Sequence, residues 1–171
     1  MLLRTAAMAL IAKAAIMSDN ILSIIPADPD WQPTAEAADA ARAVLRRLVP
    51  QLDGFVTTEY RITWHKQVAA VDCGANLERI ECPACQNAID VEWWSDLLED
   101  CLETGFTSLA VMVPCCGAKV SLNDLRYDWP CGFARFELEA WNPNRDWLTA
   151  DELAELAAAL GCDVRQVLAH I

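Results

Sequence analysis

Hydrophobic and polar positions predict four short strands, placed toward the two ends of the chain. Residues 21–26 (ILSIIP) are almost all apolar and end at a proline, which is typical of a short buried strand. After Asp53-Gly54, apolar and polar positions alternate, and they alternate again at 133–141 (FARFELEAW). We expect strands at 21–26, 55–65, 133–141 and 164–170.

The same pattern predicts a helix after the first strand and another before the last. Thr34 can cap the run AEAADAARAVLRRLV, whose three arginines lie late, where the helix dipole favours positive charge. Its apolar face comprises Ala38, Ala41, Val44, Leu45 and Leu48. Thr149 and Glu152 form a capping box before ADELAELAAAL, and Gly161 is expected to end that helix.

Both ends of the chain therefore follow the order strand, helix, strand. The segments PDWQPT (29–34) and RDWLT (145–149) each place Asp-Trp shortly before a capping threonine. Chance is the alternative, because each residue type suits a helix entrance. We predict an α+β fold in which two βαβ halves form a ferredoxin-like sandwich. It would be a single domain over 18–171, with a zinc-binding α/β insertion at about 70–131.

The cysteines of that insertion predict a metal site. Cys82 and Cys85 form a Cys-x-x-Cys knuckle, and Pro83 stiffens it. A second knuckle, VPCCGAKV, carries Cys115 and Cys116, with Val113 where a first cysteine is expected. Because structural zinc takes four ligands, we assign Cys82, Cys85, Cys115 and Cys116 as a structural zinc site.

The fourth ligand of this site is open to alternatives. Cys116 is the secure ligand of the second knuckle, and Cys115 is the nearest candidate for the fourth position; Cys131, Cys73 and His65 are reserves. Two other interpretations remain: the cysteines are buried hydrophobes, or the first pair is a redox motif.

An acidic helix is predicted between the knuckles, over 90–103. One face carries Trp94, Leu97, Leu98, Cys101 and Leu102. The helix also carries Asp90, Glu92, Asp96, Glu99, Asp100 and Glu103, without any lysine or arginine. These acidic residues form either a solvated face or a docking surface for a basic partner. After the second knuckle, Ser121 and Asp124 form a capping box that predicts a short helix.

Charge and composition narrow the class of protein. A formal net charge of -12 argues against a binder of nucleic-acid phosphates. The chain is 54% hydrophobic, which argues against disorder, and it lacks an uncharged apolar run of the ~18 residues that a membrane span needs. Eight cysteines in 171 residues indicate a reduced, metal-binding set, so we expect a cytoplasmic protein. Residues 1–17 are expected to be an extension or a helix, or a weak signal peptide that Lys13 interrupts.

Catalytic signatures are missing from the sequence. It contains no phosphate loop, no Gly-x-Ser-x-Gly elbow and no His-Glu-x-x-His helix. A four-thiolate site is closed, whereas a hydrolytic zinc site keeps an open position. We therefore expect no catalytic residues. The alternative is a small enzyme or ligand binder that uses residues near the knuckles, among them Asn123, Arg126, Tyr127 and Asp128, or a cleft that also unites Asp30 and Asp146.

Two resemblances accompany these patterns. CPAC and PCCGA resemble zinc-ribbon knuckles, which implies a metal-stabilised fold. The wider pattern of NILSIIPADPDW, VPCCGAKVSLNDLRYDWPCGFARFELEAWNP and a closing AHI resembles a group of uncharacterised bacterial proteins, some labelled automatically as sugar-transporter ATPases. The missing phosphate loop makes an ATPase physically implausible, and the group has no established activity to carry over. We expect a zinc-stabilised acidic protein that binds a protein partner, for example to neutralise a toxin or effector.

Overall fold

A computed structural model describes residues 19–71, 73–102 and 104–171 of the chain. The extension or helix expected at 1–17 lies outside these residues. The described part has a mixed α+β structure with α-helices and several antiparallel sheets. Within it, no helix combines the length and the apolar character that crossing a membrane requires.

The main sheet joins the two ends of the chain, as the sequence predicts. It contains β1 (Asn20–Pro26), β2 (Glu59–Val71), β8 (Gly132–Trp141) and β9 (Val164–His170), in the order β2-β8-β1-β9. Every neighbouring pair is antiparallel. Within the described residues, the first strand therefore lies between the last two, β8 and β9.

The strand expected at 55–65 is displaced along the sequence. It starts at Glu59 because residues 51–58 form a loop, which Gln51 closes by accepting a hydrogen bond from the backbone N–H of Thr58 at 2.6 Å. Phe55 in this loop is 62% exposed, so its apolar character does not mark a strand. At its other end β2 runs on to Val71, with an irregularity in its pairing between Trp64 and Ala69.

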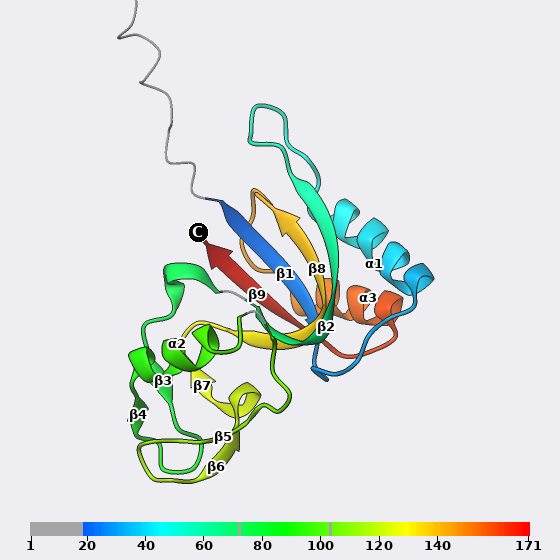
Figure 1. The fold of residues 1–171 in the computed structure, drawn as a ribbon. Coiled ribbons are helices and arrows are strands. Elements are labelled where there is room, and N and C mark those ends of the chain that lie inside the picture. The colour runs from blue at the N-terminus through cyan, green and yellow to red at the C-terminus, as the bar shows by residue number, and fades with distance from the viewer. Residues whose placement is uncertain (1–18, 72, 103) are drawn as a thin grey trace, which may run out of the picture.

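Two helices cover one face of the sheet. They are α1 (Ala35–Leu48) and α3 (Ala150–Leu160), which lie side by side in Figure 1. Thr34 caps α1 by accepting from the backbone N–H of Ala37. The predicted capping box of Thr149 and Glu152 is present at the start of α3, and Gly161 ends that helix. Both helices therefore begin where their side-chain caps place them.

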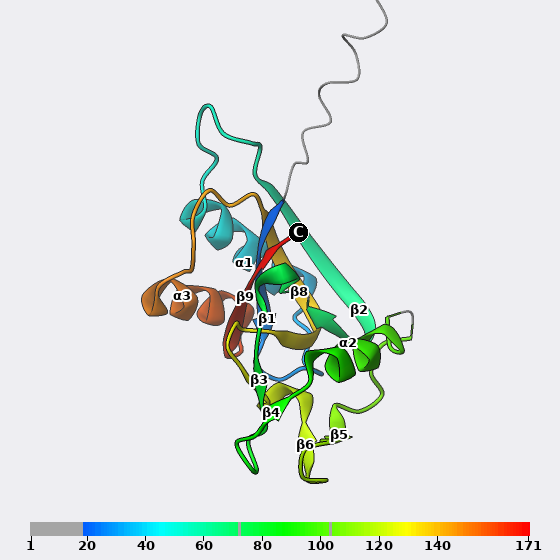
Figure 2. The ribbon, with the colours of Figure 1, turned by 90° about the vertical axis from the view of Figure 1, so that its left-hand side faces the viewer.

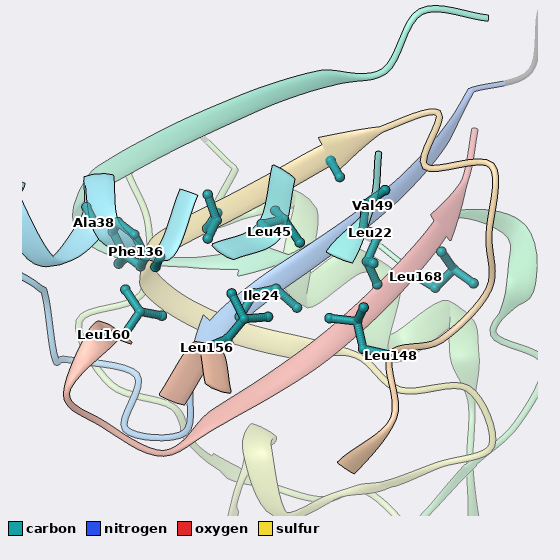
Figure 3. Close-up of a cluster of buried hydrophobic side chains, with 13 residues drawn as sticks. Leu22, Ile24, Ala38, Leu45, Val49, Phe136, Leu148, Leu156, Leu160 and Leu168 are labelled. Carbon is teal, nitrogen blue, oxygen red and sulfur yellow. The ribbon is translucent and has the colours of Figure 1, made fainter. Parts of the chain in front are cut away.

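The largest hydrophobic cluster fills the space between these helices and the sheet. Figure 3 shows side chains from both layers meeting there, such as Leu45 and Leu156 from the helices and Ile24 and Phe136 from the strands. All four of these side chains have no exposed surface. Burial at about 25 cal/mol per Å² makes this cluster a main source of stability.

The segment between β2 and β8 forms a separate layer away from α1 and α3 (Figures 1 and 2). We call residues 73–131 the insertion. It holds the 3-10 helix η1 (Gly74–Asn76), β3 (Ile80–Glu81), β4 (Ala88–Ile89), α2 (Val91–Glu99), β5 (Ala110–Met112), β6 (Lys119–Ser121), η2 (Leu122–Asp124) and β7 (Arg126–Tyr127). Its strands form one sheet of order β4-β3-β7 and a second of β5 and β6.

A second hydrophobic cluster lies between the insertion and the main sheet. Ile80, Val113 and Leu122 of the insertion contribute buried side chains to it, as does Phe133 of β8. Two details of the insertion differ from expectation. The acidic helix ends at Glu99, and Leu102, expected on its apolar face, is 75% exposed. The capping box expected at 121 and 124 begins a single 3-10 turn in which Ser121 accepts from the backbone N–H of Asn123.

Candidate metal centre

The first knuckle is a tight turn between β3 and β4. The backbone N–H of Cys82 donates to Asn87 O at 2.9 Å, and the N–H of Gln86 donates back to Cys82 O at 2.9 Å. Gln86 has a φ of 63°, which closes the turn in the left-handed region. The turn places Cys82 at its base and Cys85 three residues on.

The second knuckle, between β5 and β6, repeats this backbone pattern. The N–H of Val113 donates to Ala118 O at 3.0 Å, and the N–H of Gly117 donates to Val113 O at 2.9 Å. Gly117 has a φ of 70°, and a glycine adopts this conformation without steric cost. Val113 therefore occupies the place of Cys82, and Cys116 the place of Cys85.

The presence of Val113 at the position equivalent to Cys82 accounts for the two adjacent cysteines of the second knuckle. Val113 is 1% exposed and packs in the cluster of the insertion, so its side chain serves the core. Cys115 stands where the first knuckle has Ala84, and it supplies the thiol that the position of Val113 lacks.

All four cysteines of the knuckles come together. The Sγ atoms of Cys82 and Cys116 are 3.9 Å apart, and those of Cys85 and Cys115 are 3.5 Å apart. All four sulfurs lie within 4.8 Å of one another. Tetrahedral bonds of about 2.3 Å from one ion to four sulfurs would separate the sulfurs by about 3.8 Å. Cys82, Cys85, Cys115 and Cys116 could therefore hold a metal ion.

Burial is uneven around this thiol cluster. Cys82 is fully buried, Cys85 and Cys115 are half-buried, and Cys116 is exposed. The site thus rests on the core of the insertion on one side and opens to solvent on the other.

The surroundings of Cys82 and Cys115 shift the pKa values of these two thiols in opposite directions. The backbone N–H of Cys85 is the main cause that lowers the pKa of Cys82, to about 7. Desolvation, together with the neighbouring thiols, raises the pKa of Cys115 to about 12. Several thiolates this close repel one another, so a divalent cation is the group that would make their joint ionisation favourable.

The reserve candidates for the fourth ligand lie elsewhere. Cys73 and Cys131 are close to each other, in a small cluster between the insertion and the main sheet. His65 lies on β2, where its Nε2 is 3.5 Å from Glu137 Oε2. The cluster of four thiols is thus complete with Cys115. The pairing of Cys73 with Cys131 was missed from the sequence, although the two residues bound the predicted insertion.

The acidic helix packs on the same core as the thiol cluster. Trp94, Leu97 and Leu98 of α2 contact the hydrophobic cluster that contains Cys82. The opposite side of the helix is exposed and acidic, at Glu92, Asp96, Glu99 and Asp100. Asp90 has a structural task as well, since its side chain caps α2 by accepting from the backbone N–H of Glu92 at 2.9 Å.

The residues suggested for a small-molecule cleft are spread over different elements. Asp30 lies in the loop before α1, and Asp146 lines a cavity of about 450 Å³ beside the loop before α3. Arg126 and Tyr127 form β7 in the insertion. Burial raises the pKa of Tyr127, and its hydroxyl donates to Leu122 O at 2.7 Å, which gives this residue a structural role.

Comparisons of the chain with protein-family models, with curated proteins and with solved structures found no match. The features of the chain that bear on its function are therefore the thiol cluster and the acidic surface beside it.

Proposed function

We propose that this protein is a zinc-stabilised, acidic, cytoplasmic protein that acts by binding another protein. The thiol cluster supports the first part of this proposal. Four cysteine sulfurs at tetrahedral spacing, with no histidine or carboxylate among them, are typical of closed structural zinc sites. Such an ion links the two knuckles and has no open coordination position for a substrate.

Zinc binding is tested on the reduced, folded protein by elemental analysis, which should find about one zinc per chain. Cys82→Ser and Cys116→Ser should each lower both the zinc content and the melting temperature, because metal binding is coupled to folding. Cys101→Ala is the control, since Cys101 lies outside the thiol cluster and should cost about 1–2 kcal/mol. Equal losses in all three variants, or a folded protein without metal, would contradict the assignment.

The second part of the proposal, binding to another protein, rests on the exposed acidic face of α2. Glu92, Asp96 and Glu99 lie on α2 and Asp100 directly follows it, in a segment that has no basic residue. The whole chain also carries a net charge of -12. Complementary charge mainly accelerates encounter with a partner, so a basic protein surface fits this face. Neutralising a basic toxin or effector is one task of this kind.

Charge reversal tests this docking surface. We expect a variant with Lys at positions Glu92, Asp96, Glu99 and Asp100 to capture its cellular partners less well, and wild-type association to slow as salt rises. The matched control reverses Asp30, Asp53, Asp146 and Asp163, which are exposed and lie outside the insertion. Equal capture by both variants contradicts the surface assignment. Turnover of a metabolite that depends on Arg126 or Tyr127 would instead favour an enzyme.

For the fold, we propose that the two halves β1-α1-β2 and β8-α3-β9 form a ferredoxin-like sandwich. The strand order β2-β8-β1-β9 and the antiparallel pairing of all neighbours support this assignment. An experimental structure in which α1 and α3 lie on opposite faces of the sheet would exclude it.

A further inference from the structure

Two cysteines outside the thiol cluster stand at the base of the insertion. Cys73 follows the end of β2, and Cys131 directly precedes β8. The last paired residues of these two strands are Val71 and Gly132. The two cysteines therefore mark the points at which the chain leaves the main sheet and returns to it.

Their sulfur atoms are in close contact. The Sγ atoms of Cys73 and Cys131 lie 2.7 Å apart, although 58 positions separate the residues in sequence. A disulfide bond is about 2.05 Å long, so the sulfurs need to approach by only about 0.7 Å. The fold already holds the two thiols close together, which strongly favours formation of a disulfide bond between them.

A cavity gives small molecules a route to this pair. It has a volume of about 340 Å³, and Cys73 and Cys131 both line it, together with Trp94, Leu98 and Phe133. The cysteines themselves are 3% and 2% exposed, so a bulky reagent cannot contact them. A small neutral oxidant of the size of hydrogen peroxide fits the cavity.

We propose that Cys73 and Cys131 form a redox-active dithiol that hydrogen peroxide converts into a disulfide across the base of the insertion. One sulfur attacks the O–O bond, becomes a sulfenic acid and releases water. The second sulfur then attacks the sulfenic sulfur, forms the S–S bond and releases a second water. The two thiols lose two electrons and two protons in total, and the peroxide takes up both.

This disulfide would tie the insertion to the main sheet without involving the metal. It closes the loop that contains both knuckles, and cross-linking a loop of this length restricts the unfolded chain. Oxidation would therefore keep the base of the insertion attached to the main sheet even when the thiol cluster loses its ion.

Trypsin separates the cysteines in a way that makes the test specific. Cleavage after Lys66 and Arg79 puts Cys73 alone on peptide 67–79, and cleavage after Arg126 and Arg135 puts Cys131 alone on peptide 127–135. Peptide 80–119 carries Cys82, Cys85, Cys101, Cys115 and Cys116, and peptide 146–165 carries Cys162.

The reduced protein is treated with a small excess of hydrogen peroxide, unfolded, alkylated, digested and analysed by mass spectrometry. We expect peptides 67–79 and 127–135 to appear as one linked species lighter by two hydrogens, which a dithiol reductant separates. Alkylation of both cysteines after treatment, or their appearance in separate sulfinic acids or in links to other cysteines, overturns the proposal.

A second measurement uses stability. Oxidation should raise the melting temperature by roughly 5–15 °C. The same treatment should give no rise in Cys131→Ala and an undiminished rise in Cys101→Ala. Zinc content, measured on the same samples, reports separately on the thiol cluster. The proposed disulfide and the proposed zinc site are therefore tested independently of each other.

Discussion

At the scale of single residues, the two knuckles differ most at the first position of the turn. Cys82 and Val113 make equivalent backbone hydrogen bonds, each in its own turn, and both side chains are almost fully buried. One side chain belongs to the thiol cluster and the other is a hydrophobic side chain of the core. The geometry therefore allows a cysteine at position 113, even though the chain uses Cys115 instead.

Moving the thiol tests this equivalence. The double variant Val113→Cys, Cys115→Ala should retain about one zinc per chain, because it restores the spacing of the first knuckle. Cys115→Ala alone should lose metal affinity at least about 10-fold. Competition with a chromogenic chelator measures both values. A double variant as weak as the single one would show that the two turns are not equivalent.

A second residue-scale prediction concerns Gly74. Its φ is 62°, and a Cβ at this position would collide with the backbone carbonyl of His170, so β9 closely approaches the base of the insertion. Gly54 is the matched control, because its φ is 82° and it faces open space. We expect Gly54→Ala to cost about 1 kcal/mol from backbone strain. Gly74→Ala should cost at least about 2 kcal/mol more in urea unfolding, and equal costs would exclude the close approach.

At the scale of elements, Arg145 clamps the two helices. Its Nη1 donates to Leu48 O at 2.9 Å, at the C-terminal end of α1, and its Nη2 donates to Trp147 O at 3.1 Å. The same guanidinium makes a bidentate pair with Glu152 at 3.0 and 2.8 Å. The end of one helix and the start of the other are thus fixed by one side chain.

This clamp predicts a pH dependence. The hydrogen bonds from Arg145 lower the pKa of Glu152 from 4.5 to about 2. Its ionised form stabilises the fold fully above the ordinary pKa, and this contribution disappears as pH falls through the lower value. Glu152→Gln should therefore be less stable than the wild type at pH 6, and the difference should shrink toward pH 2. A difference that stays constant in denaturant titrations across this range would contradict the prediction.

Elements were predictable where local chemistry defines their ends. Thr34, Thr149 and Gly161 bound the two long helices as expected, because caps act on the neighbouring backbone. The acidic helix was expected to reach residue 103 but ends at Glu99. Periodicity could not find that end, since Leu102 continues the apolar pattern although it is exposed. Its exposure depends on contacts with distant parts of the chain.

At the scale of the whole molecule, the sequence predicted the four strands of the main sheet and the four cysteines that come together in the thiol cluster. Equivalent motifs at the two ends indicated the sheet, and cysteine spacing indicated the site. The partnership of Cys73 and Cys131 was not predictable, because it depends on how β2 and β8 extend beyond the helices to carry the insertion. Spacing along the chain contains no information about that extension.

Metal removal should affect the two layers of the molecule differently. The insertion has only small sheets, and its hydrophobic cluster is completed by Val68 and Phe133 of the main sheet, whereas the other face of that sheet packs against α1 and α3. A chelator should therefore increase amide hydrogen exchange across 80–127 while leaving β1 and β9 protected. Exchange measured by mass spectrometry checks this. A uniform increase over the chain would show that the ion stabilises both layers as one cooperative unit.

The pairing of Val71 with Gly132 also has a consequence for how such a chain can be rearranged. The ends of a long excursion already stand side by side, so a tight two-residue turn could replace it and leave a β-hairpin. Conversely, any segment with adjacent ends could be grafted at this junction, at an entropic cost that grows only slowly with its length. The four-stranded sheet could in this sense accept other inserted segments in place of residues 73–131.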